Sequence, residues 1–378
     1  MKEESFQELK RQAVDTQLCI FCGTCVAVCP AGCIAFQADG PQLDGECTEC
    51  GQCLEACPGL GGPLQQLDQL VFGRVRTEEE DMGGLGIRLA DTNLISGDRE
   101  IRRHGYTGGK LTAVLASLLE KKEIQGAVVS RWGEVSPFPW FAWPVVATTR
   151  EGLVDGAGSK YVFTPNLMAL EEIAARQDID SIALVGLPCH LQGLRKLELL
   201  GEPYSTLAGK VKYAFGLYCG APMLARDDFM RYVAELCETS SEKIAAVDFH
   251  RVSKEFDVAY DLVLKDGEHA SKRFNIGELL TGIGRYPRWY RCTLCTDYSA
   301  EHADISFGGS HVTPRTKAGN EVVTRALADG WLVPSRPIEH LDKLAEQVDR
   351  AMTKMKKEEN RRRISEFKND GKPVPNYD

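Results

Sequence analysis

The stretch CIFCGTCVAVCP, residues 19–30, decides how the first part of this chain folds. Its cysteines follow the spacing C-x2-C-x2-C-x3-C, and a proline comes directly after the fourth one. Residues 47–58, CTECGQCLEACP, repeat the same spacing and also end in proline. Fourteen cysteines are many for a chain of 378 residues with no visible secretion signal. Thiols that stay reduced and cluster in this way indicate metal or redox chemistry rather than disulfides.

The two runs have the ligand spacing of bacterial two-cluster ferredoxins, in which three thiolates bind one 4Fe-4S cluster and the fourth reaches the other cluster. The spacing therefore predicts two clusters held crosswise. One is expected on Cys19, Cys22, Cys25 and Cys57, and the other on Cys47, Cys50, Cys53 and Cys29. Zinc is the alternative, but zinc sites prefer two CxxC pairs at a wider separation. Cys33 is outside the register and is expected to be a small buried side chain.

Composition argues against several classes of protein. The net charge of −9 disfavours nucleic acid or an anionic membrane as the main partner. No apolar run reaches the roughly 18 residues of a membrane span. The first residues, MKEESFQELKRQ, lack the apolar segment of a signal peptide. We therefore expect a cytoplasmic protein.

The domain organisation follows from where the patterns change. Residues 1–65 are predicted to form the two-cluster domain, with two short strands around a Gly-Pro turn between the cysteine runs. Residues 66–100 mix charge and glycine without periodicity, which predicts a linker strap on the surface. From 101 to 335, apolar runs alternate with helical patterns and indicate an α/β or mixed α+β core. Residues 336–378 predict a helix with the basic run KKEENRRR and a polar tail, either solvated or in contact with a partner.

Two of the predicted strands of the core end in cysteine, at Cys189 and Cys219. Ligands of open α/β sheets sit outside the carboxyl ends of the strands, so these thiols are expected at one rim. The segment RCTLCTD adds Cys292 and Cys295. Four thiols from three loops suit a third 4Fe-4S cluster or a zinc ion. A surface CxxC dithiol beside two unrelated buried cysteines is the other interpretation, and Cys237, in a predicted helix, is expected to be structural.

Two glycine-containing loops are candidates for binding phosphate. In HGYTGGKLTAVL, Gly108 and Gly109 lead directly into an amphipathic helix, and the amide groups at such a helix start suit a pyrophosphate like that of FAD. A plain helix start explains the same pattern.

In GAGSKYVFTPN, residues 156–166, two glycines, a hydroxyl and a lysine could hold a phosphate or place a cation beside a flavin ring. A turn with an exposed lysine is the alternative.

Five segments resemble, in this order, the coenzyme F420-reducing hydrogenase beta subunit family, which includes formate dehydrogenase beta subunits. They are YTGGKLTAVL, GSKYVFTPN, GLPCHLQGLRK, GLYCG and RCTLCTDYSAEHADISFGG. The resemblance implies an α/β flavoprotein core that binds FAD beside a 4Fe-4S cluster, preceded by the small ferredoxin domain. It implies a cluster on Cys189, Cys219, Cys292 and Cys295. It implies a flavin site on Thr107, Gly108, Gly109, Thr112, Gly158, Ser159, Lys160 and Tyr161, with Ser159 and Lys160 as the candidate catalytic residues.

The function implied by the resemblance is that of an iron-sulfur flavoprotein oxidoreductase of anaerobic metabolism, usually as a subunit of a larger complex. Hydride exchange with coenzyme F420 at FAD is coupled to one-electron transfer through three 4Fe-4S clusters, because a flavin exchanges electrons in pairs or singly. The alternative is an electron-relay subunit of a larger hydrogenase, formate dehydrogenase or heterodisulfide-reductase-like complex that uses NAD(P), ferredoxin or another organic acceptor. A zinc-stabilised binding module is a third interpretation. The lack of a GxGxxG motif with a downstream acidic residue disfavours NAD.

Two positions depart from the family pattern, and both are expected near the redox pocket. His190 follows Cys189 where a more neutral polar residue is typical, and GGSHV, residues 308–312, lacks an acidic residue that often follows the final glycine. Six basic residues near the expected cleft fit an acidic coenzyme, although they could also form a solvated basic face. They are Arg102, Arg103, His104, Arg285, Arg288 and Arg291.

Overall fold

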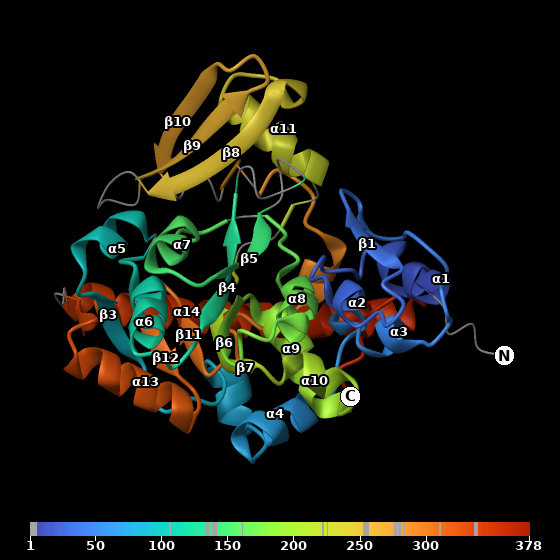
Figure 1. The fold of residues 1–378 in the computed structure, drawn as a ribbon, viewed down its shortest axis with the longest axis horizontal. Helices are drawn as coiled ribbons and strands as arrows, with labels where there is room; N and C mark the ends of the chain where they lie inside the picture. Colours follow the sequence, from blue (N-terminus) through green and yellow to red (C-terminus); the bar gives the residue numbers. More distant parts are fainter. Residues whose placement is uncertain are drawn as a thin grey trace.

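The computed structural model describes residues 6–105, 107–132, 137, 142–160, 162–220, 223–224, 226–251, 257–275, 278, 281–282, 284–309, 311–335 and 339–378. Three β-sheets organise these residues, one of two strands, one of three and one of eight. In Figure 1 the largest sheet lies in the middle, with the small N-terminal module at its right and a lobe above it. No helix in the described ranges is long and apolar enough to cross a membrane.

The eight-stranded sheet has the strand order β13-β3-β12-β11-β7-β6-β4-β5. Its strands are β3 (Thr92–Ser96), β4 (Gly126–Arg131), β5 (Trp143–Ala147), β6 (Ile182–Gly186), β7 (Val211–Leu217), β11 (Ile305–Phe307), β12 (His311–Pro314) and β13 (Leu332–Pro334). The central strands β11, β7, β6 and β4 are parallel, and antiparallel strands flank them. Parallel strands are usually covered on both faces, which is why β6 is an unbroken apolar run and buried throughout. The mixed α/β core that the sequence predicts is therefore present.

Helices cover both faces of this sheet. One face carries α5 (Arg99–His104), α6 (Lys110–Glu120), α7 (Arg150–Asp155) and α13 (Lys317–Ala328), and the other carries α8 (Ala169–Ala175), α9 (Pro188–Leu200) and α10 (Tyr204–Ala208). Successive residues of a strand point to opposite faces. Ala127 and Val129 of β4 therefore belong to the core under α6, whereas Val128 belongs to the core under α8 and α9.

The N-terminal module shares one apolar core with α8, α9 and α10. Its elements are α1 (Phe6–Leu9), α2 (Thr24–Ala27), β1 (Ile34–Gln37), β2 (Gly40–Leu43) and α3 (Gln52–Glu55). The predicted pair of strands is present, but the turn lies at residues 38–39, and the Gly-Pro pair begins the second strand. Helices α2 and α3 start directly after Gly23 and Gly51, whose left-handed backbone, with φ of 82° and 75°, favours glycine.

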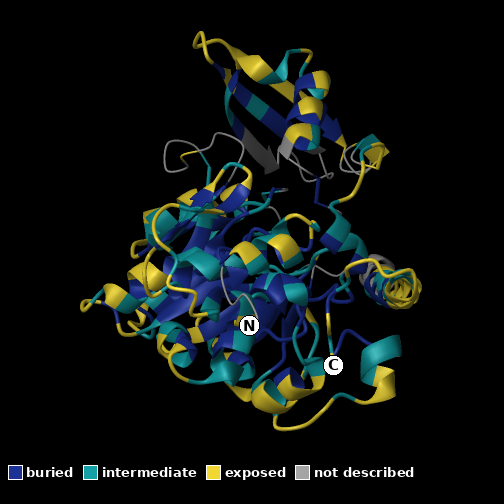
Figure 2. Cartoon of the chain, turned by 90° about the vertical axis from the view of Figure 1, so that its right-hand side faces the viewer, coloured by how far each residue is buried: buried dark blue, intermediate teal, exposed yellow. Residues whose placement is uncertain are grey.

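A lobe beside the main sheet consists of β8 (Ile244–Arg251), β9 (Asp257–Leu264), β10 (His269–Asn275) and α11 (Arg226–Leu236). The three strands are antiparallel. Phe229 and Val233 of α11 pack with Tyr260 and Leu262 of β9 in a core of their own. Figure 2 shows this lobe at the top, with its buried positions facing inward and its outer edges exposed.

The segment 66–100 is more regular than the sequence predicted. Helix α4 (Leu64–Phe72) extends into this segment. Strand β3 within the segment joins the main sheet, and α5 begins at the end of the segment. The strand was missed because it is only five residues long and because one of its two buried positions, Ser96, is polar, whereas only the other, Leu94, is apolar. The strap is therefore part of the core and not only a surface connection.

The C-terminal helix α14 (Glu339–Asn369) is solvated on one side only, because part of its basic run is buried against the rest of the chain. Lys357 is only 1% exposed, and its ammonium pairs with Asp81 at 3.0 Å and with Glu301 at 2.7 Å. The tail beyond the helix returns to the N-terminal module, where Asn376 forms a β-bridge with Gly61. The C-terminal segment therefore contacts the strap, the core and the first module.

Candidate functional site

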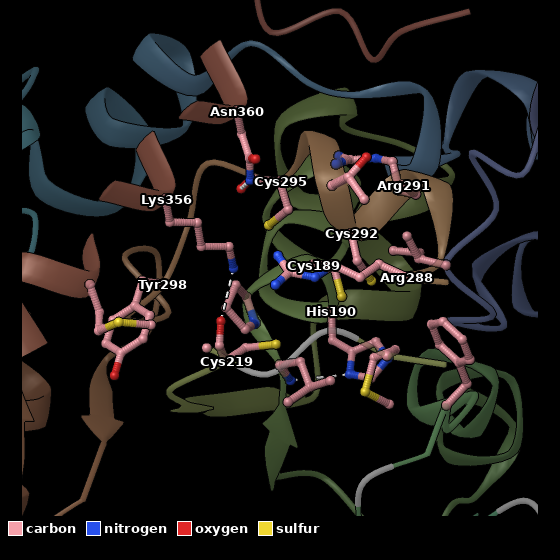
Figure 3. Close-up of a pocket in the computed structure, with 18 of the residues that line it drawn as sticks. Cys189, His190, Cys219, Arg288, Arg291, Cys292, Cys295, Tyr298, Lys356 and Asn360 are labelled. Atoms are coloured by element: carbon pink, nitrogen blue, oxygen red, sulfur yellow. Dashed lines mark hydrogen bonds between the residues drawn. The ribbon is translucent and has the colours of Figure 1, made fainter. Parts of the chain in front are cut away.

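Four cysteines from three segments line one cavity of about 130 Å³ (Figure 3). Cys189 is the second residue of α9, directly beyond β6, and Cys219 lies two residues beyond β7. Cys292 lies in the short 3-10 helix η6 (Tyr290–Leu294), and Cys295 follows it. Because β6 and β7 are parallel neighbours, their carboxyl ends bring the first two thiols to one rim, as predicted. We call this space the cysteine cavity.

Burial makes the thiols of Cys189, Cys219 and Cys292 poor acids when no cation is present. Burial, followed by the neighbouring thiols of Cys219, Cys295 and Cys292, raises the pKa of Cys189 well above its usual range. Burial and the thiol of Cys219 raise the pKa of Cys292 to about 12. Thiolate is the form that binds iron or zinc, and binding of the metal removes the proton. The donor set therefore fits a positively charged metal group.

Two side chains of α14 complete the rim of the cysteine cavity. Lys356 donates from Nζ to the carbonyl of Cys219 at 2.8 Å and to that of Asp297 at 2.6 Å (Figure 3). Asn360 donates from its amide to the carbonyl of Cys295 at 2.6 Å. Burial alone lowers the pKa of Lys356, but the thiols of Cys295 and Cys219 raise it above the usual value, so the ammonium stays charged. Sequence reasoning missed both residues because their basic run looks like a solvated helix face.

A second cavity, of about 120 Å³, lies at the start of α6. We call it the glycine cavity. It is lined by six of the predicted flavin residues, Thr107, Gly109, Thr112, Gly158, Ser159 and Lys160. Gly108 supports the loop instead, because its φ of +80° favours glycine and a Cβ there would lie 2.6 Å from the Ile95 side chain. Tyr161 lies outside the described residues.

Lys160 holds its own loop at the wall of the glycine cavity. Its Nζ donates to the carbonyls of Gly156, Ala157 and Gly158 at 2.6, 2.7 and 3.1 Å. These bonds hold the ammonium against the backbone that leads into Ser159. The loop and the start of α6 thus bring backbone amides, hydroxyls and one lysine to a single cavity.

The two cavities share a wall, because Thr164, Leu187 and His190 line both of them. His190 is 2% exposed, and its Nδ1 accepts the N–H of Leu187 at 3.2 Å. Burial lowers the pKa of His190 to about 4, although a hydrogen bond to the backbone of Thr164 opposes this effect. The imidazole is therefore neutral at pH 7 and is fixed by backbone groups. One of the two departures from the family pattern thus lies at the boundary between the cavities.

The cysteines of the N-terminal module fall into two groups with the predicted crosswise membership. The first group lines a small cavity of about 20 Å³ and consists of Cys19, Cys22, Cys25 and Cys57. The second group surrounds Cys53, whose pKa is raised to about 12 by burial and then by Cys47, Cys50 and Cys29. Cys33 is buried, as predicted, with its sulfur 3.5 Å from that of Cys29.

The three groups of thiols form a row. Cys189 in the cysteine cavity interacts electrostatically with Cys22 of the first group. Cys25 of the first group interacts in the same way with Cys53 of the second. At the far end of the row, Cys50 is exposed. The row therefore runs from the wall of the glycine cavity to the surface of the N-terminal module.

Hydrogen bonds beside the cysteines fix the N-terminal module against the core. Trp289 donates from Nε1 to the carbonyl of Cys19 at 2.7 Å. The N–H of Leu167 donates to the carbonyl of Cys22 at 2.9 Å. Both acceptors are residues of the first thiol group, so these bonds set its position relative to the cysteine cavity.

The six basic residues expected around one cleft have different surroundings. Arg288 and Arg291 line the cysteine cavity. Arg291 is 2% exposed and donates from Nε to the carbonyl of Gly59 at 2.9 Å, which makes it a contact between module and core. The other four, Arg102, Arg103, His104 and Arg285, are not among the described residues that line either cavity. Arg102, Arg103 and His104 end α5 directly before Gly105, which lines the glycine cavity, so a basic cleft for an acidic coenzyme stays a prediction.

Within the described part of the chain, no three Cys, His, Asp or Glu side chains form a group that could hold a single metal ion. The thiolates around a 4Fe-4S cluster stand farther apart than those around one zinc ion, because iron and sulfide atoms lie between them. Thiols spread around a cavity are compatible with the larger group.

Comparisons with known protein families match most of the chain. A family described as a 4Fe-4S dicluster domain matches residues 11–58. The N-terminal and C-terminal parts of the coenzyme F420 hydrogenase/dehydrogenase beta subunit match residues 95–171 and 179–339.

Individual relatives agree with these families. The chain is 28% identical over 291 residues to the coenzyme F420 hydrogenase subunit beta of Methanothermobacter thermautotrophicus, covering 74% of this chain and 95% of that one. It is 29% identical over 333 residues to the coenzyme F420-dependent sulfite reductase of Methanocaldococcus jannaschii, covering 82% of this chain and 46% of that one. A chain of the F420-reducing [NiFe] hydrogenase complex from Methanosarcina barkeri superimposes with a TM-score of 0.60 and 28% identity, over 77% of this chain and 96% of that one.

Proposed function

This chain belongs to the coenzyme F420 hydrogenase/dehydrogenase beta subunit family, and from that premise we propose that it is an iron-sulfur flavoprotein oxidoreductase that works with partner redox subunits. FAD occupies the glycine cavity, one 4Fe-4S cluster occupies the cysteine cavity, and two more clusters occupy the N-terminal module. The protein exchanges a hydride with coenzyme F420 and exchanges the two electrons singly with a partner.

The observation that carries this proposal is the common wall of the two cavities. A group that exchanges hydride handles two electrons at once, whereas an iron-sulfur cluster handles one, so a flavin that connects them must lie beside a cluster. Here three described residues, Thr164, Leu187 and His190, line both the cavity with the predicted flavin residues and the cavity with four thiols.

In the cysteine cavity, Cys189, Cys219, Cys292 and Cys295 hold the cluster, which supplies one-electron transfer when bound. Lys356 offsets part of the negative charge that four thiolates bring into a buried site. Its bond to the carbonyl of Cys219, and that of Asn360 to the carbonyl of Cys295, hold two of the ligand loops in place.

In the glycine cavity, the chain offers the groups that an anionic diphosphate needs. Gly109 is the N-cap of the 11-residue helix α6, so the first backbone amides of that helix lie at the cavity. Thr112 and Ser159 add hydroxyls, and Lys160 adds a cation. These residues bind and orient the flavin, and the roles of Ser159 and Lys160 beside its ring remain part of the proposal, as does a contribution from Tyr161.

The row of thiols supports electron exchange at the surface of the N-terminal module. The first group of cysteines lies next to the cysteine cavity, and the second group includes the exposed Cys50. Electrons therefore enter or leave beside Cys50, where a partner subunit docks. An electron-relay subunit that uses NAD(P), ferredoxin or another organic acceptor needs the same row of thiols. The glycine cavity favours hydride exchange, since a chain that only relays electrons between clusters needs no second cavity.

Anaerobic purification tests this function. We expect about twelve iron atoms per chain, from three clusters of four, together with one FAD. Reduced coenzyme F420 should bleach the flavin absorbance band, whereas NADH and NADPH should leave it unchanged. Zinc in place of iron, or a reconstituted protein that retains no flavin, would contradict the proposal. If a nicotinamide bleached the band and F420 did not, the proposed cofactors would stand, but the hydride carrier would be the nicotinamide.

A further inference from the structure

Four ionisable side chains connect the glycine cavity with the outside of the main sheet. Lys110 is the first residue of α6 and lines the cavity, and His311 is the first residue of β12. Asp91 lies just before β3, and Asp349 lies on α14. None of the four is one of the proposed flavin or cluster ligands. Asp91, His311 and Asp349 come together where the strap, β12 and α14 pack, and Lys110 reaches this group through the carbonyl of Gly309, two residues before His311.

Lys110 is an unusual residue for a cavity wall, because it is a lysine that is only 1% exposed. Its ammonium donates to the carbonyl of Gly309, which is a neutral partner. Burial lowers the pKa of Lys110 to about 7, although Asp349 and Asp91 oppose the shift. A buried lysine in this state gains and loses a proton close to neutral pH.

His311 joins the two carboxylates. Its Nδ1 lies 3.3 Å from Oδ1 of Asp91, and its Nε2 lies 3.7 Å from Oδ2 of Asp349. Thr313 donates to Asp91 at 2.8 Å, and Tyr298 donates to the other oxygen of Asp349 at 2.8 Å. The two aspartate side chains are each 12% exposed, whereas that of His311 is 6% exposed. The two carboxylates are therefore slightly more exposed than the imidazole between them.

Two polar atoms of this set have unused hydrogen-bonding capacity. Oδ2 of Asp91 and Nε2 of His311 are buried, and neither has a hydrogen-bond partner among the residues that the structure describes. Buried polar atoms without a protein partner are usually satisfied by ordered water. These two atoms are therefore free to exchange protons with water.

The chemistry of the glycine cavity requires such a connection. A hydride consists of one proton and two electrons, and iron-sulfur clusters accept only the electrons. Each hydride that is converted into two single electrons therefore leaves one proton behind, and the reverse reaction consumes one. We propose that Lys110 accepts and returns this proton and that Asp349, His311 and Asp91 pass it to and from solvent. The proposal rests on the proposed function, because it needs hydride exchange in the glycine cavity.

The surroundings of the set decide how its protons distribute. Burial alone lowers the pKa of His311, but Asp91 and Asp349 raise it above its ordinary value. Lys110 and His311 therefore bind protons with more similar strength than a free lysine and a free histidine. The other charged or titratable groups near the four residues are Arg88, Tyr218, Tyr298 and, next to Tyr218, Arg315.

The first test follows the proton and the flavin together. The protein carrying FAD and its clusters is mixed rapidly with reduced coenzyme F420 in weakly buffered solution, and a pH indicator and the flavin band are recorded. We expect Lys110→Met to delay the proton signal relative to the flavin signal by about a hundredfold, the low end of what a positioned acid or base contributes. FAD content should not change. Lys121→Met, at the far end of α6, is the matched control and should leave both signals as they are.

The second test is an equilibrium measurement that needs no coenzyme F420. The flavin midpoint potential is titrated with a chemical reductant at several pH values. In the unaltered protein its slope against pH should change near pH 7, since Lys110 is charged below that pH and neutral above it. The change of slope should be absent in Lys110→Met and in Lys110→Arg, because arginine stays charged throughout.

The outcomes separate this inference from the function on which it rests. Undelayed proton release and an unaltered potential profile in both Lys110→Met and His311→Gln would overturn the relay and leave the function standing. If reduced F420 fails to bleach the flavin of the unaltered protein, the function fails, and the potential profile still decides whether Lys110 exchanges a proton with the cavity. A network that only holds α14 in place predicts a lower melting temperature for both variants with an unchanged profile.

Discussion

Cys189 and His190 are consecutive residues of α9, yet they face different surroundings: Cys189 lines the cysteine cavity alone, whereas His190 lines both cavities. A single step along the chain thus separates a proposed cluster ligand from the wall common to the two cavities. This relationship ties the distance between the two proposed cofactor sites to the first turn of one helix.

Removal of the His190 ring should weaken this wall. His190→Ala leaves the buried N–H of Leu187 without its acceptor and opens a void, so we expect a loss of about 2 kcal/mol in the free energy of unfolding. Equilibrium unfolding in urea measures it. His190→Gln is the matched control, because its amide oxygen can replace Nδ1 as acceptor. Equal stability of the alanine variant and the unaltered protein would show that the ring does not support the wall.

Cys189→Ser should remove one cluster and leave the other two. Iron should fall from about twelve to about eight atoms per chain, because serine is a poor ligand for iron and the N-terminal groups do not include residue 189. Reduction of the remaining clusters by way of the flavin should stop. Cys237→Ser, next to α11 and outside all three groups, should keep the full iron content. Full iron in Cys189→Ser would mean that the assignment of the core cluster is wrong.

The reduction potential of the core cluster should depend on Lys356. Lys356→Met removes the buried cation beside Cys219 and Cys295, which makes an added electron less favourable, so the potential should fall. Redox titration monitored by electron paramagnetic resonance measures the change. Lys354→Met, on an exposed part of the same helix, is the control and should leave the potential unchanged. A shift of equal size in both variants would point to a general effect of charge.

The flavin should bind more weakly when the start of α6 loses its hydroxyl. Thr112→Val keeps the shape of a buried side chain on the glycine cavity and removes one hydrogen-bonding group, which is worth about 1 kcal/mol, or roughly fivefold in FAD affinity. Fluorescence titration of the flavin-free protein with FAD gives the affinity. Thr324→Val, on the exposed side of α13, provides the comparison. Identical affinities for both variants would place the cofactor elsewhere.

Lys110 should make stability depend on pH in a defined window. Its pKa is about 7 in the folded chain and about 10.5 when unfolded, so between these values the unfolded chain binds more protons. The contribution of Lys110 to the free energy of unfolding therefore rises between pH 7 and pH 10.5, by roughly a few kcal/mol. Lys110→Met should be at least as stable as the unaltered chain at pH 7 and should lose this rise. The difference between the two proteins in urea unfolding at pH 7 and pH 10 measures it, and parallel curves would contradict a buried neutral lysine.

Local spacing predicted the N-terminal module well, because cluster ligation imposes its own geometry on short cysteine runs. The membership of both thiol groups, including the exchange of Cys29 and Cys57, could be inferred from the chain alone. The meeting of Cys189 and Cys219 could also be predicted, since parallel strands end at one rim.

Residues that reach the site from distant polar segments could not be predicted in the same way. Lys356 and Asn360 belong to a helix with a strongly polar composition, and nothing local distinguishes its buried face from its solvated one. The strand β3 was hidden in a charged strap for a similar reason. Burial of a polar side chain depends on the element that packs over it, and that contact has no local pattern in the sequence.

The position of α14 also has a consequence for biogenesis. All four core thiols are synthesised well before Lys356 and Asn360, and residues 376–377 bond back to the N-terminal module at residues 60–64. The rim of the cysteine cavity is therefore complete only once the last segment of the chain has been made and has folded back onto the core.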